Sequence, residues 1–224
     1  IDLPGETMGI VYGNKMTTID AACNSFGQTI NVNMMQMMSA YCSIINGGML
    51  YQPHIVKRIE SANGEVVKEN KATLVRQTVT MSTSKLLRRY LKSTVETGTA
   101  KKVAVTGYSV AGKTGTAQKS PRSENKWLIS FIGHAPADNP KFAIYVIIDE
   151  PDGTTGTSGS SADVLTLSHD ILEKLLPYMS VYKDSLEPET DTGTAEDEYT
   201  VDGVPEGSIQ NTATENLQNM PSVN

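Results

Sequence analysis

Residues 107–118 read Gly-Tyr-Ser-Val-Ala-Gly-Lys-Thr-Gly-Thr-Ala-Gln, and two incompatible structures compete for them. The first eight residues match the pattern GxxxxGK[ST] of a phosphate-binding loop, in which a helix starts at the Lys-Thr pair. The alternation of residues ahead of Lys113 instead favours a strand, Tyr108–Gln118, that runs on through the motif. The two interpretations differ in whether the backbone coils or stays extended after Lys113, and this difference sets both the fold class and the chemistry.

A phosphate-binding loop requires a helix directly after its lysine, because the N–H groups and the positive dipole end at the helix start bind the anion. Here Gly115 occupies the first helical turn and Pro121 follows soon after. Inside a helix these two residue types cost about 1 and 3 kcal/mol relative to alanine. Asp149-Glu150 still ends an apolar run in the manner of a magnesium-binding strand. A nucleotide-binding enzyme that uses GYSVAGKT therefore remains one alternative.

As an exposed edge strand, residues 113–116 offer the groups needed to bind an extended peptide beside a serine-enzyme active site. Lys113 supplies a cation for a substrate carboxylate, and the hydroxyls of Thr114 and Thr116 add directional hydrogen bonds. Gly115 has no side chain, so a substrate backbone can lie close to the strand and pair with its free N–H groups. The backbone N–H of Thr116 can donate to a developing oxyanion, a contribution of about 3 to 4 kcal/mol in other enzymes.

The rest of the chain predicts a mixed fold up to about residue 179. Asn33 is placed to cap a helix that ends at Gly47-Gly48, and Asn63-Gly64 is a strong hairpin signal. The apolar stripe of the first helix consists of Met34, Met37, Met38, Tyr41, Ile44 and Ile45. Further expected elements are a helix over 84–95, strands over 127–133 and 142–149, and a last helix that Pro177 ends. The short connection over 134–140 makes the last two strands antiparallel, so the fold class is α+β, an antiparallel sheet flanked by helices.

Charge divides the chain of 224 residues into two parts. The net charge is −6, but residues 180–224 carry ten acids and one base, which leaves the rest at +3. This composition predicts a body over 1–179 and an acidic, disordered linker over 180–224. The overall negative charge argues against a nucleic-acid partner, and the longest apolar run, Phe142 to Ile148, has the length of a strand rather than a membrane span. Five cations flank the lysine motif and can attract an acidic substrate: Lys101, Lys102, Lys119, Arg122 and Lys126.

Other chemistry-bearing residues do not form a pattern. Cys23 and Cys42 are too few for a disulfide framework and are expected to be buried free thiols, and no Cys/His cluster indicates a metal site. Histidines 54, 134 and 169 fall in a loop, a turn and a helix, without a serine or carboxylate partner by spacing. The connection from Gly153 to Ser161 is expected to be a plain loop.

Lys113-Thr114-Gly115-Thr116-Ala117-Gln118 resembles the third motif, KTG, of the penicillin-binding serine transpeptidases, in the form typical of the class B enzymes. The resemblance covers about residues 1–178, because further landmarks occur in the family's order. Among them are Leu3-Pro4-Gly5-Glu6, Ser25-Phe26-Gly27-Gln28 and Val95-Glu96-Thr97-Gly98-Thr99-Ala100. The resemblance implies an incomplete serine β-lactamase/transpeptidase fold, a groove that Gln118 helps to line, and no metal or organic cofactor.

The resemblance also implies a reaction and a location. In this family a serine attacks the D-Ala-D-Ala bond of a peptidoglycan stem peptide, and an amine of a second stem resolves the acyl-enzyme. The expected ligands are therefore peptidoglycan stem peptides and β-lactam antibiotics, which are trapped at the same serine. The implied location is the outer face of the cytoplasmic membrane, with an anchor upstream of this chain, and division or sporulation wall-synthesis proteins are expected partners.

The nucleophile motif SxxK and the second motif SxN precede the Leu3–Glu6 landmark in the family, so this chain is predicted to lack both and to be inactive alone. Look-alikes occur at Ser82–Lys85, Ser180–Lys183 and Ser61–Asn63. Their positions indicate a helix-capping region, the start of the linker and a hairpin turn. A second alternative is a non-catalytic cell-wall scaffold module, whose strand edge and acidic tail recruit partners.

Overall fold

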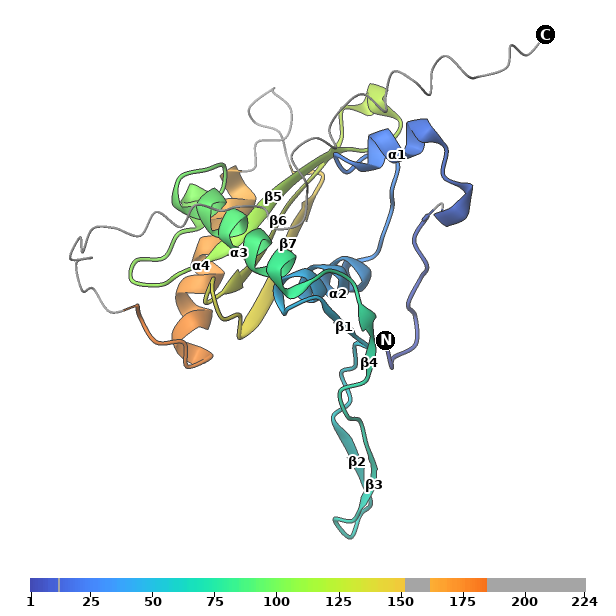
Figure 1. Ribbon diagram of the computed structural model, residues 1–224, viewed down its shortest axis with the longest axis vertical. Helices are drawn as coiled ribbons and strands as arrows, with labels where there is room; N and C mark the ends of the chain where they lie inside the picture. The colour runs from blue at the N-terminus through green and yellow to red at the C-terminus, as the bar shows by residue number, and fades with distance from the viewer. Residues whose placement is uncertain (12, 152–161, 185–224) are drawn as a thin grey trace, which may run out of the picture. The chain divides into compact units, whose positions relative to one another are not determined.

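The computed structural model describes residues 1–11, 13–151 and 162–184 (Figure 1). Within these residues the strands pair antiparallel in three small sheets, β1 with β4, β2 with β3, and β5-β6-β7. The elements are, in chain order, η1 (Gly13–Lys15), α1 (Thr18–Asn24), α2 (Met34–Ile45), β1 (Met49–Tyr51), β2 (Arg58–Glu60), β3 (Val66–Glu69), β4 (Leu74–Gln77), α3 (Met81–Glu96), η2 (Lys101–Val103), β5 (Ala111–Gln118), η3 (Arg122–Glu124), β6 (Trp127–Ala135), β7 (Phe142–Asp149) and α4 (Ala162–Tyr178).

Helix α2 begins where the sequence predicts it, directly after Asn33. The Asn33 side chain accepts a hydrogen bond from the backbone N–H of Gln36, and the Gln36 side chain accepts one from the backbone N–H of Asn33. This capping box satisfies two backbone groups at the helix start. Tyr41 and Ile45 of the predicted stripe are buried, whereas Met34 is 49% exposed. The C-terminal half of the helix therefore carries the contact with the core.

Helix α3 begins at Met81, three residues before its predicted start. The Thr80 hydroxyl accepts a hydrogen bond from the backbone N–H of Thr83 and caps the helix. Ser82, which was predicted to lie in the capping region, is therefore in the first turn. Ser84 lies in the same turn, fully buried, and accepts a hydrogen bond from the backbone N–H of Gly47. The sequence does not distinguish these caps, because serine and threonine are both favoured at this position.

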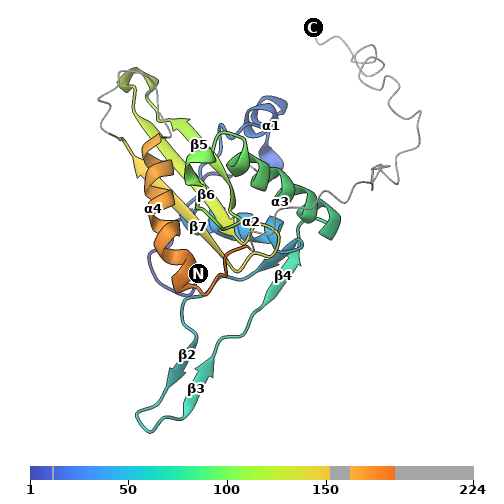
Figure 2. The same ribbon diagram turned by 90° about the vertical axis from the view of Figure 1, so that its left-hand side faces the viewer.

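The Asn63-Gly64 turn joins β2 and β3 as predicted, and their register places Ile59 opposite Lys68. Figure 2 shows this hairpin running away from the pair formed by β1 and β4. Every residue of β2 and β3 is exposed, so the hairpin contributes little to the core.

The sheet β5-β6-β7 is the centre of the body. Its register places Thr114 opposite Phe131, and Phe131 opposite Val146. Strand β7 has its predicted bounds. Strand β6 extends two residues beyond its predicted end and includes His134, which was predicted to lie in a turn. The last two strands are antiparallel, as the short connection between them requires.

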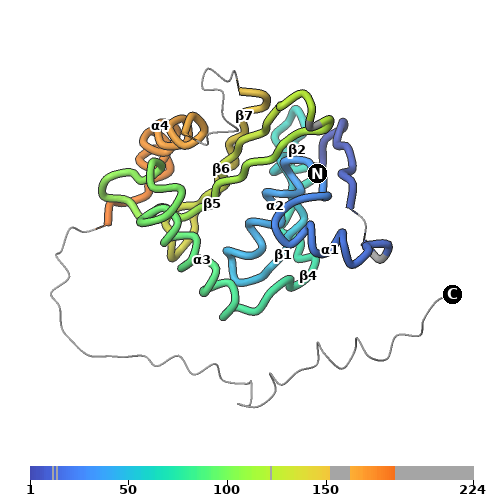
Figure 3. Tube along the Cα trace, turned by 90° about the horizontal axis from the view of Figure 1, so that it is seen from above, coloured from blue at the N-terminus to red at the C-terminus, as the bar shows by residue number. Residues whose placement is uncertain are grey.

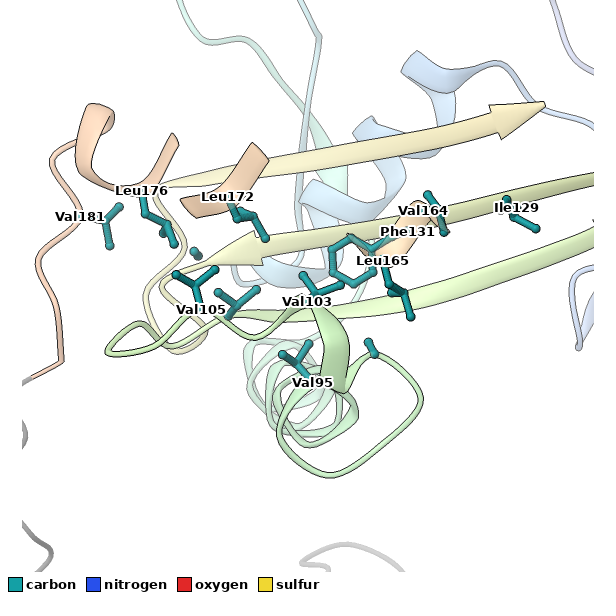
Figure 4. Packing of buried hydrophobic residues seen from close by; sticks show 13 residues of the cluster. Val95, Val103, Val105, Ile129, Phe131, Val164, Leu165, Leu172, Leu176 and Val181 are labelled. Carbon is teal, nitrogen blue, oxygen red and sulfur yellow. The ribbon is translucent and has the colours of Figure 1, made fainter. Parts of the chain in front are cut away.

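Helices cover both faces of this sheet, as Figure 3 shows for α4 and α2. The face that carries Ile129 and Phe131 packs against α4 and against Val95 and Val103 (Figure 4). On the opposite face, Tyr41 of α2 contacts β6. The predicted class, α+β with an antiparallel sheet flanked by helices, is confirmed.

Packing continues past residue 179, where the sequence placed the start of the linker. Pro177 lies inside the last turn of α4, one residue before its end. Val181 is 5% exposed, and the backbone N–H of Asp184 donates to the carbonyl of Gly107 at 2.8 Å. The predicted loop over 153–161 and the predicted linker from residue 185 onward lie outside the described residues. None of the helices that the structure describes combines the length and apolar character needed to cross a bilayer.

Candidate functional site

Strand β5 stays extended through the glycine-lysine motif. It begins at Ala111, three residues later than predicted, and continues to Gln118. A helix does not begin at Thr114, so the positive helix end that a phosphate-binding loop requires is missing. The nucleotide-binding interpretation is therefore wrong, and the strand interpretation is confirmed for Lys113 and the residues that follow it.

The backbone groups of β5 alternate between its neighbour β6 and its free edge. The carbonyl of Gly112 accepts a hydrogen bond from the hydroxyl of Thr94 on α3, so this residue faces away from β6. The N–H of Lys119 donates to the carbonyl of Lys126, just ahead of β6, so odd-numbered residues face the neighbouring strand. Because residues two apart share a side of the strand, the N–H of Thr116 faces the free edge with Gly112.

The side chain of Lys113 is exposed at this edge. Its ammonium donates to the carbonyl oxygen of Thr114 at 3.0 Å and to the Thr114 hydroxyl at 3.3 Å. Within the described residues no carboxylate lies at ion-pair distance from it. The contacts that hold the Lys113 ammonium are thus with neutral groups of Thr114.

The other residues of the motif differ in exposure. Thr116 is exposed, whereas Thr114, Gly115 and Gln118 are half-buried. A Cβ at Gly115 would lie 2.5 Å from the hydroxyl oxygen of Ser130, the residue opposite it on β6. A side chain here would force the Ser130 hydroxyl to turn away, so packing inside the sheet favours glycine, a reason that the sequence alone does not reveal.

Lys119 connects β5 to β7 beyond the motif. Its ammonium lies 2.9 Å from a carboxylate oxygen of Asp149 and 2.7 Å from one of Glu150. The Glu150 and Asp149 carboxylates raise the pKa of Lys119, and Lys119 in turn lowers the pKa of Glu150. Lys126 also pairs with Glu150, at 3.5 Å. Lys119 and Lys126 are therefore paired with carboxylates of this chain, whereas the sequence predicted that they would attract an acidic substrate.

His134 forms a buried pair that sequence reasoning missed. Its Nδ1 lies 2.7 Å from the Tyr41 hydroxyl, and its Nε2 lies 3.1 Å from the carbonyl oxygen of Ala137. Burial lowers the pKa of His134 to about 4 and raises the pKa of Tyr41. Tyr41 belongs to the predicted apolar stripe, and a phenol in such a stripe is the one signal that a buried polar partner exists.

Two of the look-alike serine motifs occupy the places that local structure predicts, whereas Ser180–Lys183 packs on the body instead of starting a linker. Ser82 is exposed in the first turn of α3, with its hydroxyl 2.9 Å from that of Thr80. Asn63, of the look-alike Ser61–Asn63, lies in the hairpin turn. In the look-alike Ser180–Lys183, the ammonium of Lys183 lies 5.9 Å from the ring centre of Tyr108. Over the described ranges, no hydrogen bond or ion pair joins any of these motifs to Lys113.

The cysteines and acidic residues add no second site. Cys23 and Cys42 are free, but both are only half-buried, which corrects the expectation of buried thiols. Partial burial raises the pKa of Cys42. In the part of the chain that the structure describes, no three His, Cys, Asp or Glu side chains come together as a metal site would need.

Comparison with known proteins places most of the chain in one family. The profile described as "Penicillin binding protein transpeptidase domain" matches residues 1–173. Stage V sporulation protein D of Bacillus subtilis is 38% identical over 186 residues, which are 81% of this chain and 28% of that protein. The probable peptidoglycan D,D-transpeptidase PenA of Neisseria meningitidis is 33% identical over 154 residues, which are 66% of this chain and 24% of that protein. The chain thus spans about a quarter of the length of these relatives.

Solved structures give the same result for the fold. The crystal structure of penicillin binding protein 3 from Mycobacterium tuberculosis in complex with ampicillin matches with a TM-score of 0.69 and 30% identity. The match covers 84% of this chain and 44% of that structure. The arrangement of α2, α4 and the central sheet is therefore that of a transpeptidase domain.

Proposed function

The chain belongs to the penicillin-binding protein transpeptidase family, and on this basis we propose that it forms the substrate-binding part of a peptidoglycan D,D-transpeptidase. The observation that carries the proposal is the edge strand β5. It combines an exposed lysine, which has no carboxylate partner among the described residues, with backbone groups that face outward from the sheet. An extended peptide that ends in a carboxylate is the ligand that fits such an edge.

Each residue of the motif has a part in this proposal. The Lys113 ammonium binds the terminal carboxylate of the stem peptide, and the hydroxyls of Thr114 and Thr116 donate further hydrogen bonds. Gly115 leaves the substrate backbone free to approach the strand, and Gln118 lines the groove. The backbone N–H of Thr116 donates to the oxyanion that develops on the carbonyl under attack.

The covalent chemistry belongs to residues outside this chain. A serine of an SxxK motif attacks the carbonyl of the D-Ala-D-Ala bond, the terminal D-Ala leaves, and an acyl-enzyme forms. The amine of a second stem peptide then attacks this ester and restores the serine. A β-lactam acylates the same serine and is bound at the same strand. The reaction needs no metal or organic cofactor.

The cellular setting follows from this reaction. We place the protein at the outer face of the cytoplasmic membrane, held by an anchor outside this chain, with division or sporulation wall-synthesis proteins as partners. Because Val181 and Asp184 still pack on the body, we place the start of the acidic linker after these residues rather than at residue 180. The non-catalytic scaffold remains the competing function, because it would use the same strand edge without a serine.

A fluorescent penicillin tests the proposal. We expect a covalent adduct in a longer protein that also carries the SxxK and SxN segments, and none on the 224 residues alone. In the longer protein, Lys113→Ala should lower the second-order rate of acylation about 10- to 100-fold, the loss expected for a hydrogen bond to a charged group. Lys68→Ala is the matched control, because Lys68 is an exposed lysine on β3 of the hairpin, and should leave the rate unchanged. A stoichiometric adduct on the isolated chain, or full activity of Lys113→Ala, would contradict the proposal.

A further inference from the structure

The segment after α3 lies against β5 on both sides of Lys113. The Thr94 hydroxyl, in the last turns of α3, donates to the carbonyl of Gly112. The Thr99 hydroxyl oxygen lies 3.3 Å from the hydroxyl oxygen of Thr114. The residues on either side of Lys113 are thus both in contact with the same short segment of chain.

The Thr114 hydroxyl also contacts Lys113, and because a lysine ammonium only donates hydrogen bonds, the Thr114 oxygen accepts from it. In the pair formed by Thr99 and Thr114, either hydroxyl can be the donor. The contacts therefore connect Lys113 to Thr114, and Thr114 to Thr99.

The backbone around Thr99 is held in place by hydrogen bonds and by core packing. The N–H of Ala100 donates to the carbonyl of Thr94 at 2.9 Å, and the N–H of Val103 donates to the carbonyl of Ala100 at 2.9 Å. Ala100 and Val103 are fully buried in the main core. Thr99 itself stays exposed at the rim of the site.

We propose that Thr99 is a positioning residue for the transpeptidase reaction: its hydrogen bond to the Thr114 hydroxyl fixes that hydroxyl and thereby orients the Lys113 ammonium toward the substrate carboxylate. The inference rests on the proposed function. Thr99 touches neither the substrate nor the reacting atoms in this assignment, and acts through Thr114 alone. Its removal should therefore weaken the recognition of carboxylates, with little effect on ligands that lack one.

The test compares two forms of one penicillin, the free acid and its methyl ester, with the longer protein. We expect Thr99→Val to lower the second-order acylation rate with the acid about fivefold, the usual worth of one hydrogen bond, and to leave the rate with the ester unchanged. Thr99→Ser restores the hydroxyl and should restore the acid-to-ester ratio. Thr97→Val is the matched control, because the Thr97 hydroxyl bonds only to Ser93 within the described residues.

The outcomes separate the inference from the proposed function. An equal loss for acid and ester, or no loss for either, would overturn the positioning role and leave the transpeptidase function intact. If the valine variant does not fold, Thr99→Ala removes the hydroxyl without added volume and must show the same selective loss. A longer protein that no penicillin acylates would overturn the proposed function and the positioning role with it.

Discussion

Both ring nitrogens of His134 have partners in the core. The carbonyl of Ala137 can only accept, so Nε2 carries the proton and Nδ1 accepts from the hydroxyl of Tyr41. The neutral imidazole is therefore fully satisfied, whereas a second proton would force the Tyr41 hydroxyl to turn and accept, and would bring a charge into the core. Burial is the main cause of the low pKa, and the positive charge of Arg88 adds to it.

We expect His134 to make folding sensitive to mild acid. Its folded pKa of about 4 lies below the ordinary 6.5, so the unfolded chain takes up the proton first as the pH falls. Stability should therefore decrease between pH 6.5 and pH 4, by about 3 kcal/mol for this group. Urea unfolding can be followed at low protein concentration through Trp127, the single tryptophan.

His134→Gln serves as the control for this effect, because it removes the titrating ring. The variant is less stable at neutral pH, but its stability should change less than that of the unchanged protein over the same pH range. An NMR titration in which His134 of the folded chain shows an ordinary histidine pKa would refute the prediction.

At the scale of the element, the close packing of β5 against β6 depends on Gly112, because there is no room for a side chain at this position. A Cβ at Gly112 would lie 2.4 Å from the ring of Phe131 and 2.6 Å from the carbonyl oxygen of Ile132. Phe131 is fully buried and is the largest such side chain in the core, so it has no room to move. The glycine that completes the nucleotide-binding pattern in the sequence is therefore required by sheet packing.

We expect Gly112→Ala to destabilise the fold by about 1 to 3 kcal/mol, the range for overpacking a close-packed core. Denaturant unfolding measures the change. Phe131→Leu creates space at the same point, so the double variant should lose less than the sum of the two single losses. Strict additivity would show that the contact between Gly112 and Phe131 is not the cause.

Sequence reasoning succeeds for features that depend on neighbours along the chain. The Asn33 cap, the Asn63-Gly64 turn and strand β7 follow from local hydrogen bonding and from apolar periodicity. The contact of Lys119 with Asp149 joins residues 30 positions apart, and that of Tyr41 with His134 joins residues 93 apart. Such pairs depend on the register of the sheet and on the placement of α2, which no local pattern specifies.

At the scale of the whole molecule, the first thirty residues leave much apolar surface in water. Met8 is 94% exposed, Ile19 75% and Phe26 70%. Helix α1 has no buried residue. Large exposed apolar surface marks interaction sites or promotes aggregation, so this segment is a candidate contact surface.

We expect the 224 residues to self-associate when produced alone, and the longer protein to remain monomeric. Sedimentation velocity at several concentrations measures this, because association shifts the distribution to larger species as the concentration rises. Replacing Met8, Ile19 and Phe26 together by serine should reduce the association without loss of α2 and β5–β7. A chain that is monodisperse at every concentration and unfolds cooperatively would count against the fragment interpretation.

The bridge from Lys119 to Asp149 and Glu150 has a mechanical consequence. The ion pairs cross β6 and connect the end of β5 to the end of β7, so at the Gln118 end all three strands of the sheet are linked. We expect a peptide that binds along β5 as proposed to reach this ion-pair cluster at the Gln118 end of the strand. The lysine at that end is already held by carboxylates from the far strand of the sheet, so it is less available to the peptide than Lys113.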